Sequence, residues 1–531
     1  MNHTLLTSIM IGSAVASAYA NEPTGRPNIV LIMCDDMGFS DLGCYGSEIK
    51  TPNIDRLAHH GVRFSRFTNT GRSCPSRAAL MTGRYQHEVG MGWMTAVDEH
   101  RPGYRGQISK EYPTIAEVMK TGGYSTYMSG KWHLTLDGSY GKPNGSMPTQ
   151  RGFDRYYGCL SGGGSYYRPK PLYNDMTPIP AESLPDDYYY TTAITDSAAM
   201  FIDRHDTRKP MFMYVAYYAP HLPLHAPEER IALCRRYYSE GYDTLRQKRF
   251  EKQKQIGLFP YDTELPVYDY EFGGERPAWN DLTEKQKQQW VNDMATYAAM
   301  IEIMDDGVGK IIDALRNKGM LDNTVFFFLS DNGSTSETGL IKQLMADLSN
   351  TPYRSYKQWC LNGGIFSPMI VAFGDPDKNL DGQQGKWSAQ RAHITDIMPT
   401  CMELAGINYP KQSDHSVLPG LSLANAIADV DAETPRTMYY EHQTSCAIID
   451  GDLKLVRYDE ASPWLLFDLS TDPFEQNDLQ NKYPSKAEYL EQKWNKWAKS
   501  HKVLPLFNLP WGERIKYYTD KNPDQSGTSN E

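Results

Sequence analysis

The chain has 531 residues, with 54 Lys and Arg residues against 65 Asp and Glu residues, which gives a formal net charge of −11. This acidic balance disfavours non-specific nucleic-acid binding, because such binding needs clustered Lys and Arg side chains to displace counterions from phosphates. Hydrophobic residues make up 40% of the chain, enough for a large core. The length suits roughly three to four domains, or one large α/β domain with a smaller companion.

The first 20 residues have the features of an export signal. Residues 5–18 are apolar or small throughout, and Ala18-Tyr19-Ala20 supplies the small side chains of a cleavage site. His3 is the only candidate positive charge ahead of the apolar stretch, so a buried N-terminal helix is the alternative interpretation. No later run reaches the roughly 18 apolar residues that a membrane helix needs. We therefore expect residues 1–20 to be a signal peptide, and the mature protein to be periplasmic or secreted without a membrane span.

Apolar runs of strand length recur along the chain and alternate with helical patterns. A run that is apolar on both faces is typical of a parallel strand covered by helices on both sides. Thr114 and Glu117 match the capping box of a short helix, and apolar residues recur at helical spacing between Val291 and Leu315. This alternation predicts an α/β sandwich. The three strand-like runs are 28–33, 210–217 and 325–329.

Polar residues follow each of these runs. They are Asp35 and Asp36 after the first run, His221 after the second, and Asp331 and Asn332 after the third. In parallel sheets ligands bind beyond the carboxyl ends of the strands, which is where these residues fall. A single Asp-Asp pair is more typical of a solvated turn, but two such polar pairs at strand ends favour a metal site. Oxygen ligands select Ca²⁺ or Mg²⁺ over zinc.

Two later regions differ from this α/β pattern. Residues 237–281 are rich in Tyr, Arg, Lys and Pro, and a connection of that length is usually a functional lid or an elaboration of the fold. From about Thr434 short strand-like segments are separated by turns, and a helix follows with Leu490 and Trp494 on one face. We expect a catalytic α/β domain over 21–433 and an antiparallel-sheet subdomain with a packing helix over 434–531. Its strand-like segments are 447–449, 453–456 and 464–467.

The 8 cysteines are scattered, with no C-x-x-C pair and no metal-finger spacing. In a chain of this length they are expected to be mostly buried small apolar side chains, with one or two disulfides left open. His393 and Asp396 are interpreted as a buried hydrogen-bonded pair. His225 is left open between a substrate contact and a structural role.

The segment from Gly71 to Arg84 carries the clearest chemical signal. Ser73 precedes a helix that is predicted to start near Pro75, and the free backbone N–H groups at such a start suit an oxyanion. Arg77 adds a cation one turn into the helix. The alternative is that Ser73 only caps the helix.

The whole 71–84 string resembles the signature of the type I sulfatases of the alkaline-phosphatase superfamily, in their arylsulfatase-like branch. In that family the pattern is Cys or Ser, any residue, Pro, any residue, Arg, and then a Leu-x-Thr-Gly stretch. A maturase oxidises the first residue to formylglycine, an aldehyde that acts as its hydrate. Here that residue is Ser73 and not Cys74. Ser-type bacterial signatures resemble those that an anaerobic radical enzyme matures. The resemblance covers nearly the whole mature chain and implies a large mixed, mostly parallel sheet between helices.

The same resemblance implies roles for individual residues. Asp35, Asp36, Asp331 and Asn332, with the modified Ser73, would bind one Ca²⁺. The two-zinc relatives in the superfamily carry a His where this chain has Asn332. In Gly130-Lys131-Trp132-His133, Lys131 would bind sulfate with Arg77, and His133 would pair with the formylglycine hydroxyl. His221 of Ala219-Pro220-His221 and Lys357 of Tyr356-Lys357 would face the scissile ester oxygen.

The resulting hypothesis is an exported sulfatase that hydrolyses O-sulfated sugars of glycans, with galactose or N-acetylhexosamine sulfates as candidates. The reaction would pass through a covalent sulfo-enzyme intermediate, and the partners would be the sulfated glycan and the maturase. The alternatives are a phosphonate monoester or phosphodiester hydrolase of the same superfamily, and a non-catalytic binder of sulfated glycans if Ser73 is not oxidised.

Overall fold

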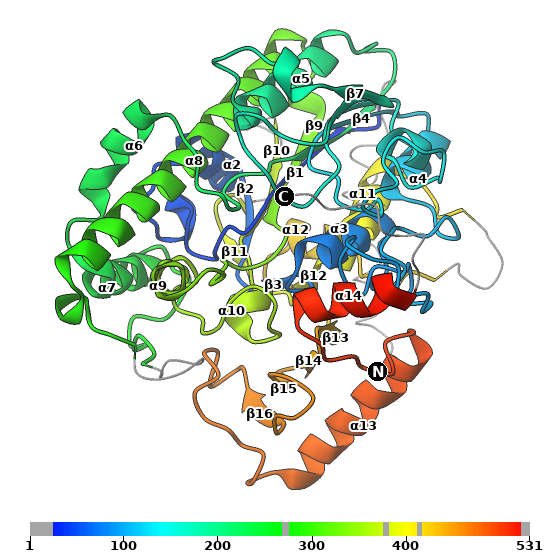
Figure 1. Cartoon of the computed structure of the whole chain (residues 1–531). Coiled ribbons are helices and arrows are strands. Elements are labelled where there is room, and N and C mark those ends of the chain that lie inside the picture. Colours follow the sequence, from blue (N-terminus) through cyan, green and yellow to red (C-terminus); the bar gives the residue numbers. More distant parts are fainter. Residues whose placement is uncertain (1–24, 268–275, 375–381, 411–416, 522–531) are drawn as a thin grey trace.

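The computed structural model describes residues 25–267, 276–374, 382–410 and 417–521. Its main element is a mixed 10-stranded sheet in the order β11-β2-β10-β9-β1-β8-β4-β5-β6-β7. The middle five strands all pair in parallel. They are β9 (Thr324–Ser330), β1 (Asn28–Cys34), β8 (Met211–Ala216), β4 (Ser125–Gly130) and β5 (Arg155–Cys159). All three predicted strand-like runs lie among them, so the predicted mostly parallel α/β sheet is confirmed (Figure 1).

Outside this parallel centre, the neighbouring strands β10 and β6 are antiparallel to it. The flanking strands are β11 (Trp387–Ser388), β2 (Gly61–Phe64), β10 (Met369–Phe373), β6 (Leu172–Asn174) and β7 (Thr177–Ile179). A separate two-stranded ladder joins β3 (Phe67–Thr68) to β12 (Ala392–His393).

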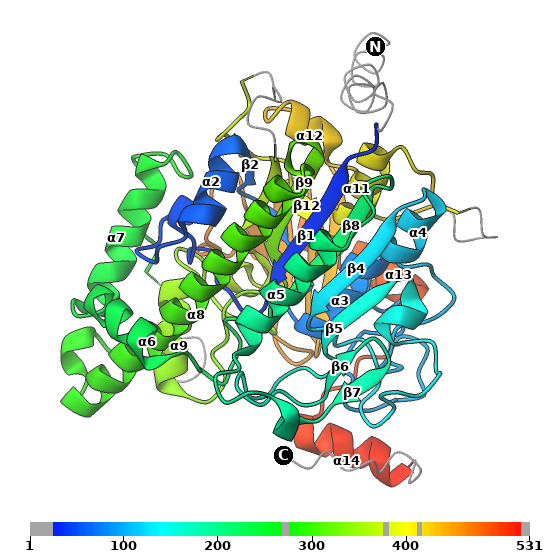
Figure 2. The ribbon, with the colours of Figure 1, turned by 90° about the horizontal axis from the view of Figure 1, so that it is seen from above.

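The large sheet has a hydrophobic core on each face. Along β1, Val30 and Ile32 belong to one core, whereas Ile29 and Leu31 belong to the other, because successive side chains point to opposite faces. Figure 2 shows helices in front of and behind the strands. The first core is covered by α2 (Pro52–His60), α5 (Tyr190–Asp203), α7 (Gly241–Gln255), α8 (Glu284–Asn317) and α9 (Leu340–Ser349). The second is covered by α3 (Ser73–Thr82), α4 (Ile115–Thr121), α11 (Ile397–Ala405) and α12 (Ala424–Ala428).

Several local predictions are confirmed. Thr114 and Glu117 form the reciprocal capping box at the start of α4. The long apolar periodicity between Val291 and Leu315 lies within α8. The 237–281 region contains α7, which packs against α9 through buried side chains, so this part of the region is an elaboration of the fold.

The C-terminal region forms a separate antiparallel sheet with four strands. The sequence indicated the last three and missed the first, β13, whose residues do not form a continuous apolar run. Helix α13 (Pro484–Ser500) lies beside this sheet (Figure 1), and α14 (Trp511–Lys521) follows. Leu490 and Trp494 of α13 share a hydrophobic cluster with the strands. The strands are β13 (Thr437–His442), β14 (Ser445–Asp450), β15 (Leu453–Arg457) and β16 (Leu465–Asp468). The domain boundaries at 20/21 and 433/434 stay predictions.

All 8 cysteines are buried and free, so none of them forms a disulfide. Among the described residues, no helix combines the length and the apolarity that crossing a membrane requires. The predicted signal peptide at 1–20 lies outside the described residues.

Candidate active site

The polar residues predicted at strand ends come together because their strands are neighbours. In the sheet order β9-β1-β8-β4, the carboxyl ends of all four parallel strands meet at one edge. Backbone hydrogen bonds continue the pairing past the strands, from Asp35 N to Ala219 O and from Lys131 N to Ala216 O. The edge therefore collects Asp35 and Asp36 from β1, Asp331 and Asn332 from β9, His221 from β8, and Lys131 from β4.

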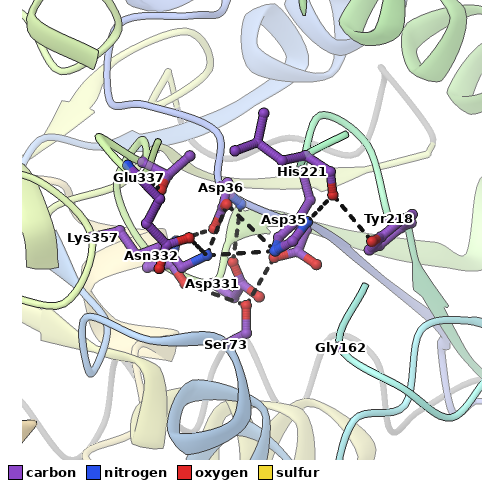
Figure 3. Close-up of polar contacts among 12 residues, drawn as sticks. Asp35, Asp36, Ser73, Gly162, Tyr218, His221, Asp331, Asn332, Glu337 and Lys357 are labelled. Carbon is purple, nitrogen blue, oxygen red and sulfur yellow. Dashed lines mark hydrogen bonds and ion pairs between the residues drawn. The ribbon is translucent and has the colours of Figure 1, made fainter. Parts of the chain in front are cut away.

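Ser73 reaches this edge from the first position of α3, which begins two residues earlier than the sequence predicted. The helix cap is Arg72, which makes no side-chain capping bond, so Ser73 is not the N-cap. Its Oγ instead donates to Asp35 Oδ1 at 2.8 Å and lies 3.4 Å from Asn332 Oδ1 (Figure 3). The hydroxyl is thus held against the strand-end oxygens, at a helix start that offers free backbone N–H groups.

We call Asp35, Asp36, Asp331 and Asn332 the oxygen cluster. Three buried cations contact it. Arg77 donates to Asp331 at 2.8 Å and lies 3.4 Å from Asp35. Lys131 Nζ is 2.5 Å from Asp35 Oδ2, and Lys357 Nζ is 2.9 Å from Asp36 Oδ2. The three carboxylates therefore have three cationic partners within ion-pair distance.

The oxygen cluster suits a hard divalent cation. Asp35, Asp36 and His221 each offer a ligand atom, and these atoms lie within 4.8 Å of one another. Figure 3 shows Asp331 and Asn332 converging on the same point from β9. Carboxylate and amide oxygens fit Ca²⁺ or Mg²⁺, and only His221 contributes nitrogen. Asp36 also has a φ of +63°, a left-handed conformation that is uncommon outside glycine and is typical of functional sites.

Burial and neighbouring charges separate the pKa values of the site. Burial raises the pKa of Asp35, but the charges of Lys131, His221 and Arg77 outweigh it and hold the value well below the usual range. Burial and the Asp35 charge raise the pKa of Asp331 to about 7. Burial also lowers the pKa of His133 and of His221, so both rings favour the neutral form.

A cavity of about 320 Å³ opens above Ser73 and is called the reaction pocket below. Of the six predicted catalytic residues, Ser73, His133, His221 and Lys357 line it. Arg77 and Lys131 do not line it, because both are fully buried behind the oxygen cluster. Their predicted contact with sulfate stays a prediction.

His133 is held over a glycine. A Cβ at Gly162 would stand 2.3 Å from His133 Cε1, so the ring can take its place only because residue 162 has no side chain. The Gly162 carbonyl also accepts from Lys131 Nζ at 2.6 Å. His133 Nδ1 is buried and has no hydrogen-bond partner within the described part of the chain. The backbone at Gly162 thus shapes the reaction pocket.

Several residues that line the reaction pocket were not predicted, and Glu337 and Trp511 are the two among them that bear on its chemistry. Glu337 accepts from Arg72 at 2.8 Å and lies 3.6 Å from Lys357. It follows Asp331 in the same loop, and that proximity was its only signal in the sequence. Trp511, the first residue of α14, lines the pocket from the far end of the chain, and no motif marked it.

The remaining histidine predictions have different outcomes. His225 does not line the reaction pocket and packs edge-on against Tyr166. His393 and Asp396 are buried and bonded, but the contact runs from the His393 backbone N–H to the carboxylate at 2.7 Å. The His393 ring bonds to Thr395 instead. Asp396 is occupied by Arg436, which explains why the two side chains do not pair.

The fold and the site together define an α/β enzyme with its reaction centre at the carboxyl edge of a mostly parallel sheet. Residues 27–407 match the family described as Sulfatase, so the chain belongs to the sulfatase family and is a sulfuric ester hydrolase. The resemblance inferred from 71–84 is thereby confirmed for the family, whereas maturation of the Ser-type signature stays a prediction.

Known proteins agree with this assignment over most of their length. An arylsulfatase of Klebsiella aerogenes is 31% identical over 446 residues, covering 75% of this chain and 91% of the relative. An N-acetylglucosamine-6-O-sulfatase of Bacteroides thetaiotaomicron is 25% identical and covers 96% of this chain and 89% of the relative. The crystal structure of Ps i-CgsB in complex with k-i-k-neocarrahexaose is 26% identical with a TM-score of 0.68, covering 95% of this chain and 100% of that one.

Proposed function

We propose that the protein is an exported sulfatase that removes sulfate from O-sulfated sugars of glycans through a formylglycine formed from Ser73. The observation that carries this proposal is the position of Ser73 between the reaction pocket and the oxygen cluster. One face of the residue meets the substrate space, and the other meets the oxygens that suit a cation. A serine that only capped α3 would need neither contact.

Two groups would complete the site. Ca²⁺, held by the oxygen cluster with the modified Ser73, would supply positive charge beside the sulfuryl group, and the aldehyde hydrate would supply the attacking hydroxyl. The protein itself orients these groups. Arg77 and Lys131 hold Asp331 and Asp35 in place, while Lys357 faces the pocket, where its charge would stabilise negative oxygens of the sulfuryl group.

His221 and Lys357 are the candidates for handling the leaving oxygen. Nδ1 of His221 contacts the Leu222 carbonyl, which can only accept, so the ring proton sits on Nδ1 in the neutral form. Nε2 then faces Lys357 Nζ at 3.5 Å. Burial favours the neutral His221 ring, whereas the charges of Asp36 and Asp35 favour the protonated one, in the balance that sets its pKa. In that protonated form His221 would donate from Nε2 to the departing oxygen, with Lys357 beside it as a second donor.

His133 would serve the later step. Its unpartnered Nδ1 is buried in the pocket wall, and burial together with the Lys131 charge holds its pKa well below the usual range. A neutral imidazole accepts a proton, so His133 would take the proton of the second hydroxyl of the hydrate as sulfate leaves.

The sugar assignment is supported by what the relatives act on or bind. The Bacteroides thetaiotaomicron relative is an N-acetylglucosamine-6-O-sulfatase, and Ps i-CgsB was solved with k-i-k-neocarrahexaose. An N-acetylhexosamine sulfate is therefore the substrate to test first, followed by the galactose sulfates that the sequence analysis also proposed.

The experiment compares kcat/KM for sulfated galactose and N-acetylhexosamine monosaccharides, nitrophenyl sulfate, and a nitrophenyl phosphodiester. We expect at least one sulfated sugar to be hydrolysed, and the sulfate ester to be preferred over the phosphodiester. A preference for the phosphodiester would overturn the proposal. Hydrolysis of nitrophenyl sulfate with no activity on any sugar would overturn the glycan assignment alone.

A further inference from the structure

A second cavity of about 430 Å³ adjoins the reaction pocket and is called the side pocket below. The two cavities share three lining residues, Arg72, Glu337 and Trp511. They are therefore neighbouring compartments of one cleft, and the Arg72–Glu337 ion pair at 2.8 Å lies on their common border. A ligand that extends out of the reaction pocket over this border enters the side pocket.

The side pocket presents amide groups without partners. Gln358, Gln443 and Asn508 line it. Within residues 25–267, 276–374, 382–410 and 417–521, none of these three side chains makes a hydrogen bond to the protein. A primary amide carries both donors and an acceptor, which matches the hydroxyl groups of a sugar.

Two of the amides are held by unusual backbone conformations. Gln358 has a φ of +92° and Gln443 a φ of +47°, a region that side-chain-bearing residues rarely adopt. The Gln358 N–H donates to Gly71 O at 2.7 Å, which ties it to the loop that carries Ser73. Such conformations persist where the surrounding structure enforces them, and they concentrate at ligand sites.

Trp511 supplies an aromatic face on the border. Its side chain is 42% exposed, although its ring lies 4.9 Å from that of the buried Trp93. Figure 2 places α14 on the side of the molecule toward which β1 points. An exposed ring at the mouth of a polar cleft suits stacking against the apolar face of a pyranose.

The position of α14 is fixed by a buried anchor. Arg514 donates to Glu99 at 2.7 Å, its guanidinium lies 4.4 Å over the Trp93 ring, and both charged side chains are nearly fully buried. Arg514 also donates to Phe507 O at 3.1 Å, which fixes the segment ahead of the helix. The exposed Trp511 is thus presented by a firmly attached element.

The charge of the side pocket favours a neutral occupant. Among the described residues that line it, Arg72 and Glu337 are the charged ones, and they pair with each other. This part of the chain therefore leaves no free cation there for a second sulfate. We infer that the side pocket binds an uncharged sugar residue glycosidically linked to the sulfated residue in the reaction pocket. This inference rests on the proposed function and adds that the preferred substrate is an oligosaccharide.

The test uses the sulfated monosaccharide with the highest kcat/KM and a disaccharide that carries the same sulfated residue. The measured quantity is the ratio of kcat/KM for the disaccharide to kcat/KM for the monosaccharide. We expect this ratio to fall about tenfold in Trp511→Ala. In Gln443→Ala and Asn508→Ala we expect the ratio to fall about threefold to tenfold, because each variant removes one neutral hydrogen bond to the second sugar. Tyr517→Ala, an exposed residue of the same helix outside both cavities, should leave the ratio unchanged.

A binding measurement keeps the inference testable where turnover is affected. In the Ser73→Ala background, calorimetry should show tighter binding of the disaccharide than of the monosaccharide, and Gln443→Ala should reduce that difference. A ratio that stays at the wild-type value in all three variants, while the monosaccharide is still hydrolysed, would overturn the inference and leave the proposed function standing. Failure to hydrolyse or bind either sugar would overturn both.

Discussion

Two of the regions that bury charged side chains differ in their surroundings: one lies behind the reaction pocket, whereas the other lines neither of the two cavities described above. At the carboxyl edge of the large sheet, the oxygen cluster and its three cations lie directly behind Ser73 and the reaction pocket. In the C-terminal region, Lys454 of β15 lies 2.7 Å from Glu475, and both side chains are fully buried. Asn362 completes this second site, since its Oδ1 accepts from Lys454 and its N–H donates to Glu475.

The difference lies in which buried groups face a cavity. The Lys454–Glu475 pair has one cation for one anion and lines neither cavity, so it has nothing to offer a ligand. The carboxyl edge combines converging oxygens, a buried ring nitrogen without a partner in the described part of the chain, and two left-handed residues, Asp36 and His133, all beside the reaction pocket. Buried charge alone therefore does not identify an active site. Unsatisfied groups beside a cavity are the better indicator.

The largest effect is expected for Ser73→Ala. Activity should fall at least about 10⁴-fold, because removing a nucleophile removes the whole covalent route. The free energy of unfolding should change by less than about 1 kcal/mol, since one small side chain contributes little to the core. Kinetics and thermal unfolding of the same preparation check both. If Ser73→Ala is inactive and also strongly destabilised, Ser73 has a structural role like that of the Lys454–Glu475 pair, which would contradict the proposed role as nucleophile.

Chelation should reduce activity to the level of Ser73→Ala, and Ca²⁺ or Mg²⁺ should restore it. A cation that binds only the folded protein also stabilises it, so the melting temperature should fall on chelation and recover with the metal. Chelation should not affect the Lys454–Glu475 region, because that pair lines neither cavity. The loss of melting temperature on chelation should therefore be the same in Lys454→Met/Glu475→Gln as in the wild type. Stoichiometric zinc in the purified protein would contradict the predicted oxygen site, because zinc favours nitrogen and sulfur ligands.

His221→Ala should separate substrates by leaving group. A sugar alkoxide needs a proton as the S–O bond breaks, whereas a nitrophenolate does not, and general acid assistance is worth about 10²–10⁴-fold. The loss in kcat/KM should therefore be far larger on a sulfated sugar than on nitrophenyl sulfate. Lys131→Met should harm both substrates alike, because its effect reaches the sulfuryl group that they share. If His221→Ala loses the same factor in kcat/KM on both substrates, His221 is not the general acid, and Lys357 becomes the candidate for that role.

Lys454→Met should act on stability and leave catalysis in place. It strands the Glu475 carboxylate in the interior, and breaking a buried pair from one side costs about 3–5 kcal/mol. The double variant Lys454→Met/Glu475→Gln should recover much of this loss, because no buried charge remains. Denaturant unfolding measures both, and kcat per folded molecule should stay within about threefold of wild type. A comparable loss of kcat would show that the two regions are coupled.

The sequence predicted which polar residues meet at the carboxyl edge, because their order along the chain fixes their positions, whereas their catalytic roles stay predictions. Asp35 and Asp331 each follow an apolar strand directly, so parallel pairing alone brings them together. Ser73 lies in the 71–84 motif, and the resemblance of this motif to the sulfatase signature identified the family. Lys454 shows the opposite case, because nothing in its strand-like segment marked it as buried. Its burial is tolerable because the fold brings Glu475 to it from outside the strand.

The features of the site that the sequence did not predict depend on tertiary contacts between distant segments. Trp511 reaches the reaction pocket because Arg514 docks α14 onto Glu99, a partner 415 residues away. Glu337 was overlooked because a single acidic residue in a loop has many solvated counterparts. Arg77 and Lys131 lie behind the oxygen cluster because of how α3 and β4 pack, and their predicted contact with sulfate stays a prediction.

The most direct test of the account is a mass spectrum of the peptide Ser73–Arg77 from protein produced with and without the anaerobic maturase. The account predicts that the matured peptide lacks two hydrogen atoms at Ser73 and that specific activity rises in proportion to this fraction. A fully active preparation in which Ser73 is wholly unmodified would contradict it.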